Sequence, residues 1–196
     1  MIKNPNHVIV IDTDIELNSL NGRRPSMLLH ACCGPCTLGC IEFLKVHFDV
    51  EVLYFNPNIR PPEEYEKREY WLKKVLDHFD VPLLECDYFP EMFEPVAFGR
   101  EADPEGGPRC NDCFSLRLSY TASKAKELGY EYYCSTLTVS SRKPAKLINE
   151  LGKKYALEYG VKWLPSDFKK RGGNLRSTRL CEELGIYQQP YCGCTP

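Results

Sequence analysis

The sequence predicts an α/β protein with three layers, in which a mostly parallel, Rossmann-like or HUP-like sheet carries helices on both faces. Two observations support this fold class. Short apolar runs, typical of buried strands, alternate with longer segments whose apolar residues recur at helical spacing. The chain has 196 residues, of which 43% are hydrophobic, and this is enough for one domain with a packed core.

The predicted strands are five short runs rich in apolar residues. They lie at residues 26–31, 50–55, 81–86, 130–136 and 161–164. A cysteine-rich motif directly follows the first run, and the turn signal Asn56-Pro57-Asn58 ends the second. Since a parallel α/β sheet carries its site beyond the carboxyl ends of the strands, we expect cysteine-rich loops at that edge.

The predicted helices lie at residues 35–48, 62–79, 114–128 and 143–159, with a short one in the tail. Pro35 stands where proline favours a first helical turn, and Gly129 and Gly160 follow the ends of two helices. Residues 87–109 contain seven Pro and Gly and are typical of a loop. We expect an N-terminal extension at 1–25, with a short strand-like run at 8–11, and one α/β domain at 26–196.

Charge and hydropathy narrow the function class. No apolar run approaches the ~20 residues of a membrane span, and none forms a signal-peptide core, so we expect a cytoplasmic protein without a membrane partner. The net charge of −2 argues against a general nucleic-acid binder. Residues 138–180, however, carry eleven basic against three acidic side chains. This basic C-terminal segment can bind phosphates or can simply form a solvated helix face.

Eleven cysteines are unusual in a chain without export features. Their odd number and the predicted core argue against a disulfide framework and favour metal ligation or thiol redox chemistry. Seven cysteines fall into three clusters: Cys32, Cys33 and Cys36; Cys110 and Cys113; Cys192 and Cys194. The other four are expected only to pack, because a free thiol behaves as a small hydrophobe: Cys40, Cys86, Cys134 and Cys181.

The first two clusters supply five thiolates, whereas a zinc site or an iron–sulfur cluster usually needs four. Adjacent side chains tend to point apart, so Cys32 and Cys33 are hard to fit to one closed site. Two metal centres sharing this corner, or one cluster with an extra thiolate, would accommodate them. Cys192 and Cys194 cannot complete a zinc site alone, and an internal disulfide bond between them would be strained. They can add ligands or act as a redox pair.

Six motifs in this chain resemble those of a single family. Between Met27 and Cys194 they are, in order, LLHACCGPC, FNPNIRPPEEYEKR, RCNDCFSLRL, STLTVSSRK, SDFKKRGG and YQQPYCGC. Together they resemble the QueH-type epoxyqueuosine reductases, and only residues 1–25 lie outside the resemblance. It implies an oxidoreductase that reduces epoxyqueuosine to queuosine in tRNA, the last step of queuosine biosynthesis, without cobalamin. The implied partners are tRNA carrying epoxyqueuosine and an electron donor.

The resemblance also implies a [4Fe-4S] cluster with an additional iron, or another divalent metal, beside it. By motif, the core thiolates of the family fall on Cys32, Cys33, Cys110 and Cys113. Cys36 falls on a position that suits a ligand to the second metal, which would act as a Lewis acid on the epoxide oxygen. We assign Cys36 and Cys33 as catalytic, and the last two cysteines as the redox pair.

Substrate binding is expected to be driven by phosphate contacts. The candidate cations are Arg109, Arg117, Arg142, Lys143, Lys169, Lys170 and Arg171. Asn56 and Asn58 are expected to hydrogen-bond the modified base or to form Asx turns. Tyr187, Tyr191 and Phe168 are candidates for base stacking or for packing, and His30, inside a strand, is expected to be buried and neutral.

Three other functions compete with this interpretation of the cysteines and the basic segment. A zinc-stabilised RNA-binding module would employ the same cysteines and basic segment without redox chemistry. A metal-free thiol–disulfide oxidoreductase would use a CxxC or CxC pair, but leaves five converging thiolates unexplained. A tRNA sulfur-transfer enzyme would need a Gly-rich ATP loop such as SGGxDS, which the sequence lacks.

Overall fold

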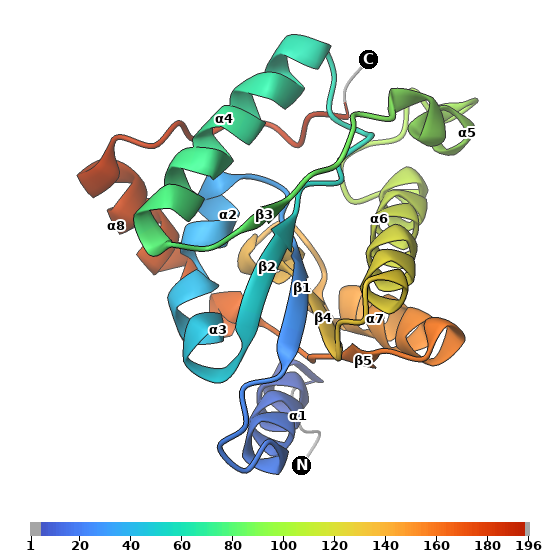
Figure 1. The fold of residues 1–196 in the computed structure, drawn as a ribbon. Coiled ribbons are helices and arrows are strands. Elements are labelled where there is room, and N and C mark those ends of the chain that lie inside the picture. The colour runs from blue at the N-terminus through green and yellow to red at the C-terminus, as the bar shows by residue number, and fades with distance from the viewer. Residues whose placement is uncertain (1–4, 195–196) are drawn as a thin grey trace.

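The computed structural model describes residues 5–194 and has a five-stranded sheet in which every pair of neighbours is parallel (Figure 1). The strand order is β3-β2-β1-β4-β5. The strands are β1 (Ser26–His30), β2 (Asp49–Leu53), β3 (Leu83–Leu84), β4 (Tyr132–Ser135) and β5 (Lys162–Trp163). The predicted parallel α/β class is therefore confirmed, although the two edge strands are only two residues long.

Helices cover both faces of the sheet and complete the three layers (Figure 1). One face carries α2 (Gly34–Leu38), α3 (Ile41–His47) and α4 (Pro62–Phe79), and the other carries α6 (Pro108–Glu127) and α7 (Ala145–Tyr159). Successive residues of β1 point to opposite faces, so Met27 and Leu29 join one core and Leu28 joins the other. This two-sided burial explains why three consecutive apolar residues, Met27, Leu28 and Leu29, form the middle of the strand. Outside these layers, α8 (Gly173–Leu184) packs on α2.

Two predicted elements have different bounds in the structure. The helix expected at 35–48 is divided into α2 and α3 at Gly39, where a Cβ atom would lie 2.6 Å from Val139 Cγ1 and 2.8 Å from the Gly173 carbonyl oxygen. The helix expected from residue 114 already begins at Pro108, because proline fits the first helical turn. Cys110 and Cys113 therefore lie on the helix and not in a loop.

The loops also contain short helical turns that the sequence patterns did not indicate. These are η1 (Pro90–Phe93), α5 (Glu94–Ala97), η2 (Thr136–Val139) and η3 (Phe168–Arg171). Within residues 5–194, none of the helices combines the length and the apolar character that a membrane span requires.

The N-terminal segment forms a helix, α1 (Pro5–Ser19), and the strand-like run predicted at 8–11 is wrong. Tertiary contacts explain the helix, since Ile9 and Leu20 are buried and the Thr13 hydroxyl donates to the Pro165 carbonyl oxygen at 2.8 Å. The helix lies at the opposite end of the molecule from α4 (Figure 1). Its acidic residues pair with the basic segment: Asp12 with Lys153, and Asp14 with Arg171.

Candidate metal centre and cleft

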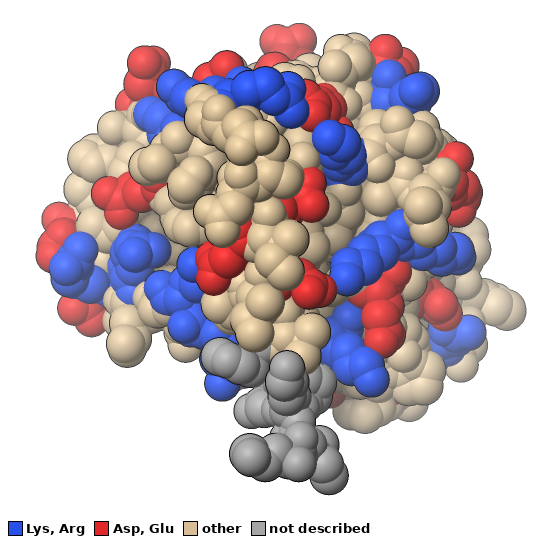
Figure 2. Space-filling model, turned by 90° about the horizontal axis from the view of Figure 1, so that it is seen from below, with Lys and Arg blue, Asp and Glu red and all other residues tan. Residues whose placement is uncertain are grey.

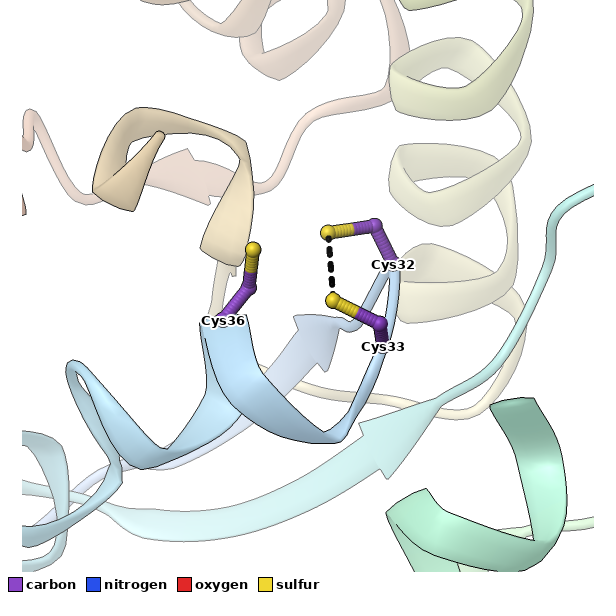
Figure 3. Close-up of side chains that lie close together, drawn as sticks. All are labelled: Cys32, Cys33 and Cys36. Carbon is purple, nitrogen blue, oxygen red and sulfur yellow. Dashed lines mark hydrogen bonds between the residues drawn. The ribbon is translucent and has the colours of Figure 1, made fainter. Parts of the chain in front are cut away.

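Three cysteines of the first motif gather at the carboxyl end of β1. Cys32 and Cys33 lie in the connection to α2, and Cys36 lies within α2. Their sulfur atoms are all within 4.8 Å of one another, and those of Cys32 and Cys33 are 3.7 Å apart (Figure 3). The two adjacent cysteines, expected to point apart, thus present their thiols to the same space.

The spacing and chemistry of these donors suit a metal. Thiolates about 2.3 Å from a shared tetrahedral ion lie about 3.8 Å from one another, close to the Cys32–Cys33 separation. Soft sulfur ligands favour zinc, copper(I) and iron–sulfur centres over magnesium or calcium. Cys33 is buried, whereas Cys32 and Cys36 are partly exposed. The group is therefore shielded on one side and accessible on the other.

Hydrogen bonds within the group favour one thiolate. Those with Cys33 and Cys36 lower the pKa of the Cys32 thiol well below its ordinary value. The same hydrogen bonds raise the pKa of Cys33 to about 12 and the pKa of Cys36 well above its usual range. The Thr136 hydroxyl also donates to the Cys32 sulfur at 3.4 Å. Cys32 is thus the first of the three to reach the ionised form that binds metals.

Cys110 and Cys113 lie on the first turns of α6, which covers the opposite face of the sheet from α2. The backbone N–H of Gly106 donates to the Cys110 sulfur at 3.2 Å, and burial raises the pKa of the Cys113 thiol to about 11. Arg117, one turn further along α6, lies 4.0 Å from the Cys113 sulfur. Its side chain also lines the cleft that Cys32 lines, and it thereby connects two of the cysteine clusters.

Arg117 is a buried cation without a carboxylate among its partners in residues 8–194. Its Nη2 donates to Asn56 Oδ1 at 2.6 Å and its Nε to His30 Nε2 at 3.3 Å. Burial and the arginine charge lower the pKa of His30 to about 3, so this histidine is neutral, as predicted. A buried charge is costly unless it is compensated. The pKa values of Cys32 and Cys192, which line the cleft together with Arg117, are lowered, so their thiolates can balance this charge.

A cleft of ≈ 280 Å³ opens beside these sulfurs. Cys32, Cys36 and Cys192 line it, so the structure brings the first and third cysteine clusters together. Four cations also line it: Arg68, Arg117, Arg142 and Lys143. Asn58 and Gln189 each contribute a buried side-chain oxygen that has no hydrogen-bond partner among the described residues. The cleft thus combines sulfur ligands, four cations beside one carboxylate, Glu105, and two unused acceptors.

The C-terminal pair is divided between two hollows. Cys192 lines the cleft, whereas Cys194 lines a second hollow of ≈ 320 Å³ together with Arg109 and Phe98. A hydrogen bond with Cys194 lowers the pKa of the Cys192 thiol to about 6 and raises the pKa of Cys194. All eleven cysteines have free thiols, so the structure contains no disulfide bond. Among the four expected only to pack, Cys40, Cys134 and Cys181 are buried and Cys86 is partly so.

Several predicted substrate contacts are engaged within the protein. Asn56 donates to the Ala31 carbonyl oxygen and accepts from Arg117, which leaves Asn58 as the asparagine that faces the cleft. Arg109 donates to the carbonyl oxygens of Arg100, Glu101 and Asp103 and braces that loop. Both of these residues act as internal supports.

The basic segment is largely offset by acidic partners. Lys169 pairs with the buried Asp167 at 3.0 Å, and Arg171 pairs with Asp14 of α1, whereas Lys170 is exposed. Seen from the α1 end, Lys and Arg alternate with Asp and Glu without a large patch of one sign (Figure 2). Of the seven predicted phosphate-binding cations, those lining the cleft are Arg117, Arg142 and Lys143.

Fold and site together define a parallel α/β protein with a cysteine site suited to metal, open to a cationic cleft. The family model described as "Epoxyqueuosine reductase QueH" matches residues 27–195. An epoxyqueuosine reductase QueH of Streptococcus pyogenes is 44% identical over 177 residues, which cover 87% of this chain and 69% of that protein. Those of Staphylococcus epidermidis and Thermotoga maritima are 42% and 38% identical, over 89% and 86% of this chain and 76% and 88% of theirs. The chain belongs to this family of oxidoreductases.

Proposed function

We propose that this protein reduces epoxyqueuosine to queuosine in tRNA, in the cytoplasm, as the last step of queuosine biosynthesis. The observation that carries the proposal is the group of three sulfurs within 4.8 Å of one another at the wall of a cationic cleft. Family membership supplies the substrate, because the relatives are named epoxyqueuosine reductases. Binding of tRNA accounts for the positive lining of the cleft.

The cofactors of this proposal are a [4Fe-4S] cluster and an additional iron or other divalent metal. Cys32, Cys33, Cys110 and Cys113 would hold the cluster, and Cys36 would serve the second metal. When bound, the centre supplies electrons one at a time and a Lewis acid for the epoxide oxygen. The buried Arg117 supports this composition, since an anionic centre balances its charge.

The reaction removes one oxygen atom and leaves an alkene, so it consumes two electrons and two protons and releases water. Cys192 and Cys194 can deliver these two electrons and two protons, because oxidation of two thiols to a disulfide releases the same number of each. The low pKa of Cys192 favours its thiolate near neutral pH, the form that reacts. An external electron donor then restores the dithiol, which gives this pair the role of a redox relay.

The substrate contacts follow from the lining of the cleft. Arg142 and Lys143 are placed to meet phosphates, and Tyr191 presents an aromatic ring for an unstacked base. The unpaired Oδ1 of Asn58 accepts a hydrogen bond from the modified nucleoside, whose added ring carries hydroxyl groups. An acceptor buried in the free protein gains more from such a bond than an exposed one does.

A zinc-stabilised RNA-binding module is the second candidate. The same sulfur spacing favours it, because three thiolates within 4.8 Å also suit one tetrahedral zinc ion. A metal-free thiol–disulfide oxidoreductase has less support, since it leaves the convergence of the Cys32, Cys33 and Cys36 sulfurs without a role.

The test uses anaerobically purified protein, dithionite and tRNA that carries epoxyqueuosine, followed by nucleoside mass spectrometry. We expect queuosine, lighter by one oxygen atom, to accumulate over time. The Cys36→Ser variant, with its metal content verified, should lose this turnover. Unchanged epoxyqueuosine with the iron-loaded wild-type protein would refute the proposed reaction.

A further inference from the structure

A buried arginine on α4 holds the C-terminal cysteine segment. Arg68, which is 2% exposed, donates from Nη1 to the Cys192 carbonyl oxygen at 2.8 Å and from Nη2 to that of Tyr191 at 3.2 Å. Its Nε donates to Glu64 Oε1, one helical turn earlier, at 2.7 Å. The guanidinium therefore joins two consecutive carbonyl groups of the segment to a buried carboxylate. We refer to Glu64 and Arg68 as the α4 clamp.

Neighbouring contacts reinforce the clamp. The backbone N–H of Arg60 donates to the Gly193 carbonyl oxygen at 2.8 Å, and the Tyr187 hydroxyl lies 3.3 Å from Glu64 Oε1. Gly193 has a φ of 103°, in the region that favours glycine, and a Cβ atom there would lie 3.0 Å from Arg68 Nη1. The close approach of the arginine to this backbone thus depends on the glycine between the two cysteines.

The clamp determines where the Cys192 thiol lies. Cys192 lines the cleft with Cys32 and Cys36, whereas Cys194, two residues further on, lines the second hollow. The segment makes no contribution to the sheet, so its backbone is held by the Arg68 guanidinium and by the backbone N–H of Arg60. Charge-assisted hydrogen bonds from a rigid guanidinium are well suited to this task, because they constrain direction as well as distance.

We propose that Arg68, oriented by Glu64, is a positioning residue that fixes the Cys192 thiol beside Cys32 and Cys36. The clamp stands on geometry alone, and its kinetic consequence rests on the proposed reductase function. Arg68 acts through the backbone of the segment and does not itself take part in the reaction. The selection of arginine follows from the geometry, because one lysine ammonium cannot hold two carbonyl groups and a carboxylate in a planar fork.

The first test measures the placement of the segment in the full chain, purified anaerobically. Alkylation of Cys192 is followed by mass spectrometry with Cys86 as internal reference, together with amide hydrogen exchange of residues 187–194. Arg68→Ala and Gly193→Ala should each raise both rates by roughly fivefold or more, because the segment opens locally. Arg68→Lys should restore part of the protection, and Lys73→Ala, on the exposed side of α4, should leave both rates unchanged.

Gly193→Ala changes neither Glu64 nor Arg68, so their ion pair can still stabilise the fold. This variant therefore tests the clamp even if Arg68→Ala does not fold. Wild-type rates in folded Gly193→Ala and Arg68→Lys proteins would overturn the clamp. In turnover assays Gly193→Ala and Arg68→Lys should both lower kcat, and Gly193→Ala should lower it by about tenfold. The KM for tRNA should change by less than about twofold in either variant. A raised KM with unchanged kcat would instead make the segment an RNA contact and refute positioning. An inactive wild-type protein would refute the proposed function, while the alkylation and exchange rates would still decide the clamp.

Discussion

The Arg117 guanidinium lies 4.0 Å from the Cys113 sulfur in the interior of the protein, with neutral His30 and Asn56 at its other nitrogens. A cation so enclosed requires an anion nearby. In this molecule the available anions are thiolates, and a cluster bound by four of them would carry net negative charge. The positive charge of Arg117, on α6, therefore acts on the sulfur atoms that line the cleft.

Replacing Arg117 with Met removes the charge and keeps most of the volume. The reduction potential of the bound cluster should fall by roughly 100 mV, since a unit charge several ångströms away at an effective dielectric constant of about 20 contributes about 2 kcal/mol. A redox titration of the anaerobic protein measures this shift. Arg117→Lys, which preserves the charge, should give a potential near that of the wild type. Equal potentials in Arg117→Met and wild type would argue against an anionic centre beside this residue.

The two asparagines after β2 should separate stability from activity. Asn56→Ala removes partners of Arg117 and of the Ala31 carbonyl group, so the free energy of unfolding should fall by about 2–3 kcal/mol. Asn58→Ala removes an acceptor without a partner and should cost about 1 kcal/mol or less. Its kcat/KM should nevertheless fall by about tenfold, the worth of one hydrogen bond to substrate. Urea unfolding and steady-state kinetics provide both quantities, and full activity of Asn58→Ala would remove this residue from the substrate contacts.

Two arginines of the basic segment should differ in their effect on RNA binding. Arg142 lines the cleft, and its ion pair with Glu105, at 3.4 Å, is largely exposed and can exchange for a phosphate. Arg142→Ala should therefore weaken binding of a tRNA anticodon stem–loop, and the slope of log K against log salt should fall in magnitude by about 1. Arg171 pairs with Asp14 and donates to the Val10 carbonyl oxygen, so Arg171→Ala should leave RNA binding unchanged and loosen α1. Fluorescence anisotropy at several salt concentrations distinguishes them. Equal slopes for both variants would mean that the RNA does not enter by the cleft.

The α1 helix should contribute stability and not catalysis. Deleting residues 1–22 exposes the surface that Ile9, Thr13 and Leu20 cover, and the free energy of unfolding should fall by about 3–5 kcal/mol. The kcat should stay within about twofold, because the contacts of α1 lie on α7, β4 and residues 165–171. Loss of turnover in a deletion variant that remains folded would assign α1 to the functional site.

The sequence patterns predicted the sheet and the first cysteine cluster because both depend on local signals. The middle of β1, residues 27–29, is apolar because both of its faces are buried, and Cys32 follows the strand closely at the edge where parallel sheets carry their sites. The α1 helix was not predicted, since its stability comes from tertiary contacts such as Thr13 with Pro165. A local hydrophobic pattern cannot predict such contacts between residues that are distant in the sequence.

Sequence reasoning did not find Arg68, because an arginine within an amphipathic helix is usually solvated. Its position six residues after Pro62, the first residue of α4, gave no sign that it is buried against Glu64 and the C-terminal backbone. Conversely, Arg109 and Arg171 are residue types that often bind phosphate, but in this structure they bind groups of the protein itself. Arg109 donates to a backbone carbonyl oxygen, and Arg171 pairs with Asp14. Charge counts along a chain do not distinguish cations that face a ligand from those that brace the fold.

We propose that thiolates from separate parts of the chain hold iron beside the cleft. Metal and acid-labile sulfide analysis of the anaerobically purified protein, with its visible spectrum before and after dithionite, is the decisive measurement. We expect a brown protein that bleaches on reduction and contains iron and sulfide in the proportions of a [4Fe-4S] cluster with additional iron. Stoichiometric zinc, or a colourless protein without iron after anaerobic reconstitution, would contradict it.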